Sequence, residues 1–213
     1  MLYTFDNDNT LYQCPEFFRK VFSETLTEVV SREKGERGLE QLQWCRKNCG
    51  GRGELALELL GIPIAHWHEL VDQASREHID LIEPSPELVT ELRKLRGHKV
   101  IYTGAPLSHA MRVTQRLGFP PGFFEFMFHW EPGDHTPVKW AGTAAPFRAI
   151  ARYFRVEPMY TVAYGDNWPY DLAPAARLEM RTVLVGGSIP EGAKPNEHHQ
   201  DLLTAVRRQN KSR

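Results

Sequence analysis

Short β-branched or aromatic runs alternate with amphipathic helical segments over the second half of the chain, and this alternation constrains the fold more than any other feature. The predicted strands lie in VIYTG, FFEFMFHW, YTVAYGD and RTVLVGG, with about ten to fifteen residues of helical pattern between them. Strands joined by helices form right-handed crossovers, which produce a parallel sheet covered on both faces. We therefore expect an α/β fold.

A helix-rich segment separates this region from a further predicted strand, Leu2–Phe5, at the N-terminus. From Pro15 onward, apolar residues recur at helical spacing for about seventy residues, and Gly35 is expected to end the first helix. The pattern predicts a core domain of residues 1–13 and 85–213. Residues 14–84 form a helical domain inserted into it.

Composition excludes several classes of function. The formal net charge of the 213 residues is -1, so no basic surface indicates a nucleic acid polymer or an acidic membrane as partner. No apolar run approaches the ~20 residues that span a bilayer, and the N-terminus is not typical of a signal peptide, so we expect a cytoplasmic protein.

Cys14, Cys45 and Cys49 have neither a disulfide framework nor zinc-site spacing. The final stretch, RRQNKSR, is expected to be a solvated tail.

Polar side chains follow several predicted strands at the point where each ends. They are Asp6, Asp8, Thr103, Gly104, Asp166 and, a few residues later, Asp171. The carboxyl ends of parallel strands meet at one edge of a sheet, where ligands bind. Because Asp and Thr also favour turns and helix caps, no single one of these residues carries much weight. Their joint occurrence predicts a functional site.

Converging carboxylates repel one another unless a cation lies among them, and hard oxygen ligands favour Mg²⁺. A Mg²⁺ ion held by few carboxylates shares its coordination with waters and substrate phosphate. The acidic residues therefore indicate a magnesium site and phosphoryl chemistry.

The motifs resemble those of the haloacid dehalogenase superfamily. FDNDNTLY is similar to its first motif, a hydrophobic strand followed by Asp-x-Asp-x-Thr, VIYTG to its second and VAYGDNWPYD to its fourth. They occur in the family's order and spread over nearly the whole chain. The resemblance implies a Rossmann-like parallel sheet core with an inserted α-helical cap, as in subfamily I, and a phosphatase that hydrolyses phosphomonoesters.

Residue by residue, the resemblance implies that Asp6 attacks phosphorus and forms an aspartyl-phosphate. Asp8 would protonate the leaving oxygen and later activate water. Mg²⁺ would be bound by the Asp6 carboxylate and the backbone carbonyl of Asp8. Asp166 would be a further ligand, with Asp171 as ligand or support. The hydroxyl of Thr103 would bind the transferred phosphoryl oxygens.

The family also uses a lysine that neutralises the transferred phosphoryl group, and Lys139 is the candidate in the correct interval. The spacing at Lys139, in HTPVKWAG, is longer than is usual in the family. The proline precedes the lysine instead of following it. Lys194 has the familiar Lys-Pro pair but follows the fourth motif. Gly104 stands where many relatives have Asn, and it belongs to the backbone expected to bind phosphate. Trp168, in the fourth motif, begins a bulky loop.

The substrate expected from the resemblance is a small phosphomonoester. Asp-Asn-Thr-Leu-Tyr and CGGRGELALELLGI resemble the pyrimidine 5′-nucleotidase-like branch, which favours a nucleoside monophosphate, with phosphoglycolate or a sugar phosphate as alternatives. Arg52, between two glycines, is a candidate contact from the cap, although an arginine in solvent would look the same. The dehalogenase branch lacks the second aspartate of the first motif, so Asp8 favours phosphate over halide substrates.

Two non-catalytic interpretations remain open at this point. Response-regulator receivers also place aspartates, Thr and Lys around a parallel sheet, but they need no helical insert and accept phosphate at a later strand. A degenerate relative could bind a partner through its cap without turnover, and Gly104 and the irregular segment around Lys139 keep this alternative open. The sequence does not indicate an oligomeric state.

Overall fold

The computed structural model describes residues 1–48, 53–129, 139 and 142–211. The described residues form two compact units. One contains Met1–Gln13 and the described residues from Ile82 onward, and the other contains Cys14–Leu81. None of the described helices is both long enough and apolar enough to cross a membrane.

The first unit is built on a single parallel sheet. Its strands are β1 (Leu2–Phe5), β2 (His98–Tyr102), β3 (Phe126–Phe128), β4 (Thr161–Gly165), β5 (Arg181–Val185) and β6 (Glu197–His199). They lie in the order β3-β2-β1-β4-β5-β6, and every pair is parallel. The predicted α/β fold with a parallel sheet is therefore confirmed. Phe5 is in register with Ile101 of β2 and Tyr164 of β4, so these three strands end at the same level.

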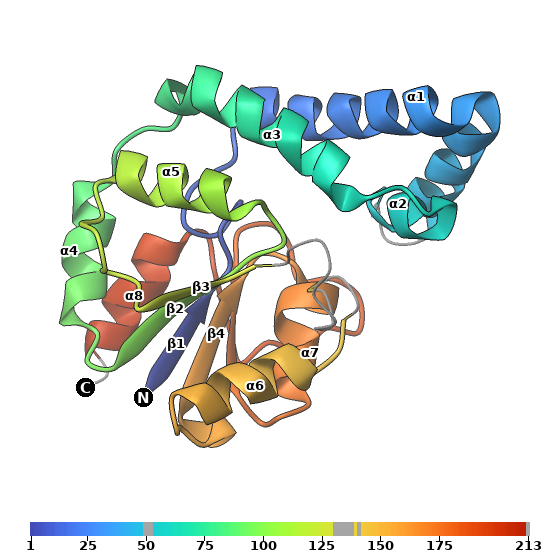
Figure 1. The fold of residues 1–213 in the computed structure, drawn as a ribbon. Helices are drawn as coiled ribbons and strands as arrows, with labels where there is room; N and C mark the ends of the chain where they lie inside the picture. The colour runs from blue at the N-terminus through green and yellow to red at the C-terminus, as the bar shows by residue number, and fades with distance from the viewer. Residues whose placement is uncertain (49–52, 130–138, 140–141, 212–213) are drawn as a thin grey trace. The chain divides into compact units, whose positions relative to one another are not determined.

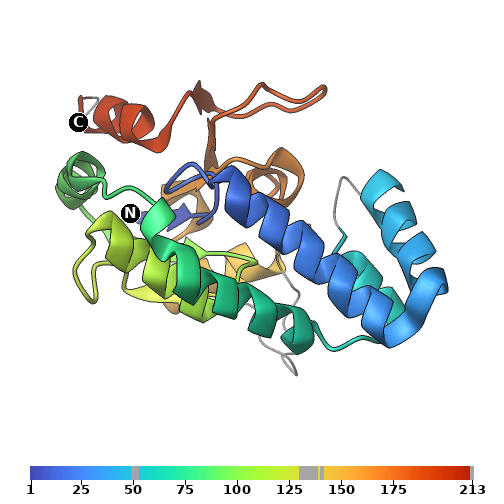
Figure 2. The ribbon, with the colours of Figure 1, turned by 90° about the horizontal axis from the view of Figure 1, so that it is seen from above.

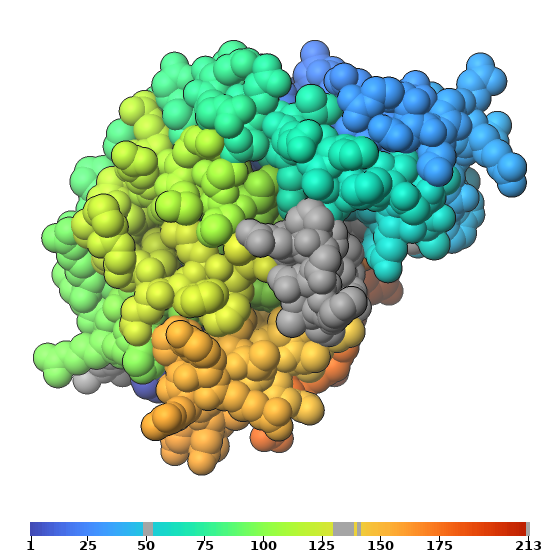
Figure 3. All heavy atoms as spheres, in the orientation of Figure 1, coloured from blue at the N-terminus to red at the C-terminus, as the bar shows by residue number. Residues whose placement is uncertain are grey.

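Helices cover both faces of this sheet (Figure 1). Those of the first unit are α4 (Pro86–Lys94), α5 (Leu107–Leu117), α6 (Ala145–Tyr153), α7 (Ala173–Ala176) and α8 (Leu202–Lys211), with short turns η3 (Pro158–Tyr160) and η4 (Trp168–Leu172). Figure 1 shows α4, α5 and α8 on one side and α6 and α7 on the other. In Figure 3 the outer surfaces of α5 (yellow-green) and α6 (orange) face solvent.

Alternating strand residues supply the core between the sheet and the α6–α7 layer. Leu2, Val100 and Ala163 point from three neighbouring strands toward Phe147 and Ile150 of α6, and all five are buried. Strand residues at every second position share one face, so the intervening residues line the opposite layer. A parallel sheet buried on both faces explains why its strands read as apolar runs.

The second unit is entirely helical among its described residues. It contains α1 (Glu16–Asn48), α2 (Leu55–Leu60), α3 (Ile64–His78) and the short turn η1 (Ile79–Leu81). Residues of α1 contact both α2 and α3. As the sequence predicted, the first helical stretch of α1 ends at Gly35, which leaves the helical conformation with φ of 61° and ψ of -151°. A second helical stretch then runs to Asn48 in a new direction (Figure 2). Glycine tolerates this positive φ without a Cβ clash.

The expectation of a solvated C-terminal tail was wrong as far as Lys211. The segment belongs to α8, whose Val206 and Gln209 are buried. Asn210 donates hydrogen bonds to the backbone carbonyl and side chain of Glu91 in α4, at 3.1 and 2.9 Å. These partners lie far away in sequence, so the local charge pattern gave no sign of them.

Gly97 fixes the approach of the chain to β2, and we predict that Gly97→Ala destabilises the fold. Its φ is +132°, and an added Cβ would lie 2.4 Å from the carbonyl oxygen of Met1, which accepts a hydrogen bond from the His98 N–H. Strain and clash together are expected to cost about 2 kcal/mol or more in urea unfolding. Gly122→Ala is the matched control, because Gly122 has φ of +76° but open space around it. Equal losses in both variants would show that the Met1 contact contributes nothing.

Candidate active site

The site begins where the two central strands end. Asp6 directly follows β1, and its N–H donates to the carbonyl oxygen of Tyr164 in β4 at 3.0 Å. Asp166 directly follows β4, so the ladder between the strands places the two aspartates side by side at one edge of the sheet. Asp6 is 8% exposed. A carboxylate in this position needs charged or hydrogen-bonding partners.

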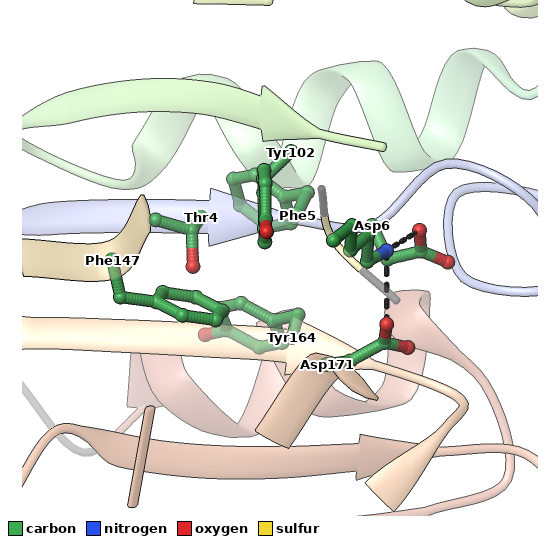
Figure 4. A pocket seen from close by; sticks show the side chains of 8 residues that line it. Thr4, Phe5, Asp6, Tyr102, Phe147, Tyr164 and Asp171 are labelled. Carbon is green, nitrogen blue, oxygen red and sulfur yellow. Dashed lines mark hydrogen bonds and ion pairs between the residues drawn. The ribbon is translucent and has the colours of Figure 1, made fainter. Parts of the chain in front are cut away.

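Lys139 supplies a cationic partner. Its Nζ donates a hydrogen bond to Oδ1 of Asp6 and lies 2.9 Å from Oδ1 of Asp171. Figure 4 shows both ion pairs as dashed lines, with Tyr102 beside them. The ammonium lies 5.5 Å from the centroid of the Tyr102 ring, a cation–π distance. The structure thus brings Lys139 to the predicted nucleophile across 133 residues of sequence.

Thr10 fixes the other oxygen of Asp6. Its hydroxyl donates to Oδ2 at 3.1 Å, and both residues are buried. The Asp6 carboxylate is therefore fixed in one orientation, with Lys139 at Oδ1 and Thr10 at Oδ2. Thr10 is the Thr of the Asp-x-Asp-x-Thr motif, but its contact with Asp6 was not among the roles predicted from the sequence.

Asp171 reaches the site through an unusual turn. It lies in η4, a single π-helical turn, and its Oδ2 accepts a hydrogen bond from the Asn167 N–H at 2.9 Å. Such turns are rare and often occur at functional sites. Gly165 leaves the space that Asp171 occupies, because a Cβ at Gly165 would lie 2.4 Å from the Cβ of Asp171. The glycine at the end of β4 is therefore required by the close approach of this aspartate.

Asp6, Asp166 and Asp171 form an acidic cluster that fits a divalent cation. One ligand atom from each lies within 4.8 Å of the others. Burial raises the pKa of Asp6 to about 7 against the effect of Lys139, and the charge of Asp171 adds to the rise. Burial and the charges of Asp6 and Asp171 raise the pKa of Asp166 to about 8. When all three are ionised, these carboxylates carry more negative charge than one ammonium neutralises, and their oxygens are the ligands that Mg²⁺ prefers.

Asp8 has a different environment, and its carboxylate is not part of the acidic cluster. Its Oδ1 accepts hydrogen bonds from the hydroxyl of Tyr12 at 2.5 Å and from Nε2 of His109 in α5 at 3.2 Å. Burial opposes ionisation of Asp8, but the hydrogen bonds from His109 and Tyr12 and the charge of His109 outweigh it. They hold the pKa of Asp8 below its ordinary value. The pKa values of the two aspartates of the first motif are therefore shifted in opposite directions: that of Asp6 is raised and that of Asp8 is lowered.

Thr103 and Gly104 follow β2 at the same edge of the sheet. Thr103 is buried, its N–H donates to the carbonyl oxygen of Phe128, and its hydroxyl accepts from the Ala105 N–H at 3.0 Å. Gly104 is half-buried. The described contacts of Thr103 join it to its own turn and to the end of β3, so its role toward phosphate stays a prediction. Arg52 lies outside the described residues.

Sequence reasoning also missed Tyr12 and His109. Tyr12 is the last residue of FDNDNTLY, two positions after the Thr that ends the Asp-x-Asp-x-Thr pattern. His109 lies on the buried side of α5 with Ala110 and Val113. A histidine on an apolar helix face was the available signal, but its partner is 101 residues away in sequence and could not be identified without the fold.

The fold and these residues define an α/β protein whose parallel sheet ends in an acidic site with a buried lysine. Residues 1–178 match the family of haloacid dehalogenase-like hydrolases. This match covers most of the chain, and the protein belongs to that family. No curated protein matches the chain in sequence.

Solved structures with the same fold cover nearly the whole chain. A HAD phosphatase from Thermococcus onnurineus is 19% identical, with a TM-score of 0.67 over 98% of this chain and 96% of that one. CbbY from Rhodobacter sphaeroides in complex with phosphate is 16% identical, with a TM-score of 0.62 over 95% and 94% of the two chains. A 2-haloacid dehalogenase from Pseudomonas syringae pv. Tomato is 20% identical, with a TM-score of 0.58 over 98% of each chain. At these identities the similarity establishes the fold.

We predict that Mg²⁺ raises the melting temperature of the protein and that Asp166→Asn removes most of this increase. At about 100 times its Kd, a ligand of the folded state adds about 2.7 kcal/mol of stability, an increase of several degrees. Without Mg²⁺ the variant should be at least as stable as the wild type, because an amide at this position is not opposed by the neighbouring negative charges that raise the pKa of Asp166. Glu83→Gln, an exposed position in the same unit, is the control. An undiminished Mg²⁺ effect in Asp166→Asn would exclude Asp166 as a ligand.

Proposed function

We propose that this hydrolase is a Mg²⁺-dependent phosphomonoesterase that transfers the phosphoryl group of a small metabolite first to Asp6 and then to water. The observation that supports this most directly is the contrast between Asp6 and Asp8. Asp6 forms an ion pair with a buried lysine, whereas Asp8 is held by Tyr12 and His109. Lys139 compensates the charge of ionised Asp6, the form that attacks phosphorus, whereas the neighbouring Asp8 carboxyl group lies outside this ion pair and is available for proton transfer.

The proposed reaction has two steps. In the first, an oxygen of ionised Asp6 attacks phosphorus, the ester P–O bond breaks, and Asp8, which takes up a proton when the substrate binds, gives that proton to the leaving oxygen. In the second, water attacks the aspartyl-phosphate and Asp8 takes a proton from it, which releases inorganic phosphate and restores Asp6. Each proton that Asp8 gives up is thus returned within one turnover.

Charge neutralisation is the proposed role of the remaining groups. Lys139 would compensate the negative charge of Asp6 and of the transferred phosphoryl group. When bound, Mg²⁺ would act as a Lewis acid that stabilises ionised Asp6 and the phosphoryl oxygens. Asp6, Asp166 and Asp171 are the carboxylates that would hold it, with the backbone carbonyl of Asp8. Thr103 and Gly104 would bind phosphoryl oxygens.

Asp8 also supports a phosphate ester over a halide as substrate. A halide departs as a stable anion and requires no proton, so a carboxyl group next to the nucleophile would have no role in its release. An alkoxide leaving group requires a proton, which Asp8 can supply. Since a 2-haloacid dehalogenase shares the fold, this distinction is tested by offering both substrate classes.

The proposed substrate is a nucleoside monophosphate, with phosphoglycolate or a sugar phosphate as alternatives. This proposal rests on the similarity of the first motif to the pyrimidine 5′-nucleotidase-like branch. The helical unit, Cys14–Leu81, is the proposed cap that selects the substrate. Helical caps of this kind exclude water when they close.

We predict that Asp6→Asn abolishes phosphate release, by on the order of 10³-fold or more, because the amide cannot form the aspartyl-phosphate. The measurement is phosphate release from nucleoside monophosphates, phosphoglycolate, sugar phosphates and 4-nitrophenyl phosphate, each with Mg²⁺ or EDTA. A 2-haloacid, assayed for halide release, is included. The melting temperature of the variant shows that it is folded. Full activity in Asp6→Asn, or halide release without phosphate release, would contradict the proposal.

We predict that Lys139→Ala lowers kcat by ~10²-fold or more, because it removes a preorganised cation from the transferred charge. Lys139→Arg keeps the charge and should retain more activity than the alanine variant. Lys94→Ala is the control, since Lys94 is an exposed lysine that pairs with Glu91 on α4. An unchanged kcat in Lys139→Ala would assign the neutralising role to another residue.

A further inference from the structure

Among the residues that the structure describes, the hydrogen-bond donors to the carboxylate of Asp8 all lie at one of its two oxygens. Tyr12 donates its hydroxyl to Oδ1 at 2.5 Å, His109 approaches the same oxygen with Nε2 at 3.2 Å, and the side-chain amide of Asn7 lies 3.3 Å from it. Oδ2 of Asp8 receives no hydrogen bond from the residues that the structure describes. The two oxygens of this carboxyl group therefore differ strongly in their hydrogen bonding.

His109 is placed for this contact by the fold. It is 0% exposed and lies in the first turn of α5, which follows directly after the turn at Thr103. Its neighbours on the buried side of the helix, Ala110 and Val113, fix the helix against the core. An ionised carboxylate only accepts hydrogen bonds, so the contact requires that His109 carries its hydrogen on Nε2. Nε2 also lies 3.4 Å from the hydroxyl of Tyr12, which closes a triangle of polar groups.

We infer that Tyr12 and His109 are positioning residues that hold the Asp8 carboxyl group in one orientation, with Oδ2 as the oxygen that exchanges protons. This inference rests on the proposed phosphomonoesterase activity. In the first step the proton on Oδ2 passes to the ester oxygen as the P–O bond breaks. In the second step a proton from the attacking water returns to Oδ2. Oδ1 remains with its donors throughout.

The physical reason lies in the freedom of an unrestrained carboxyl group. The terminal torsion of an aspartate has a broad, two-fold energy profile, so its oxygens interchange readily. A general acid must lie within hydrogen-bond reach of the atom that it protonates, and a displacement of about 1 Å can cost on the order of 10²-fold in rate. Donors on Oδ1 alone remove this freedom and leave Oδ2 for the reacting atoms.

The test compares leaving groups that differ in their need for a proton. Tyr12→Phe removes one hydroxyl, His109→Leu removes the ring donor, and His109→Gln provides an amide N–H close to the position of Nε2. Each variant is assayed with Mg²⁺ on ethyl phosphate and on 4-nitrophenyl phosphate, whose leaving group departs without protonation. The rate measured is that of leaving-group release in the first turnover, so that the attack of water does not contribute. Tyr153→Phe, an exposed tyrosine, is the control.

The expected result is a loss that depends on the leaving group. Tyr12→Phe and His109→Leu should slow release from ethyl phosphate about tenfold or more, with less than about a threefold effect on 4-nitrophenyl phosphate. His109→Gln should approach the wild-type rate. In an Asp8→Asn background, Tyr12→Phe should add less than about a twofold further loss, because residues that act through one another are not additive.

The outcomes separate this inference from the function on which it rests. Equal losses on both substrates, or a full additional loss in the Asp8→Asn background, would overturn the positioning role and leave the phosphomonoesterase proposal intact. Tyr12→Phe keeps the ring and its packing, so this test stands even if His109→Leu fails to fold. If the folded wild type releases phosphate from no substrate of the panel with Mg²⁺, the proposed function itself is overturned, and this role with it.

Discussion

The buried ion pairs of Lys139 with Asp6 and Asp171 are the interaction on which the rest of the site depends. Three carboxylates and one ammonium lie at the end of the sheet, where taking each charge out of water costs several kcal/mol. Removing the lysine would leave buried negative charges without compensation. The large apolar core on both faces of the sheet offsets this cost. The acidic cluster proposed to bind a cation is thus stabilised by apolar residues that lie outside it.

The arrangement of the site follows from the topology of the sheet. Because β1 lies between β2 and β4, the residues after all three strands meet at one edge. The α6–α7 side supplies Lys139 and Asp171, which precede those helices, whereas α5 on the other side supplies His109. Asp6 and Asp8 are two residues apart, but their side chains are contacted by residues from opposite sides of the sheet. This division explains how two adjacent carboxylates acquire opposite pKa shifts.

Much of the fold could be predicted from local pattern, because β1 and β4 are short apolar runs followed directly by aspartates. Lys139 could be proposed only from its interval between motifs, and its contact with Asp6 required the folded chain. His109 could not be assigned, because a histidine on an apolar helix face is compatible with simple core packing. The helix at the C-terminus was missed for a related reason. Its charged residues are typical of a solvated tail, and the hydrogen bond from Asn210 to Glu91 that attaches it to α4 is visible only in the folded chain.

The central position of β1 also affects how the chain is made. β1 leaves the ribosome before its two partner strands, which begin at His98 and Thr161. At about 5–20 residues per second, on the order of ten seconds pass before β4 has been synthesised. During that time the apolar side chains of Leu2 and Phe5 have only part of the sheet to bury them. The residue proposed to attack phosphorus is thus attached to a segment that nascent-chain chaperones can bind before the site exists.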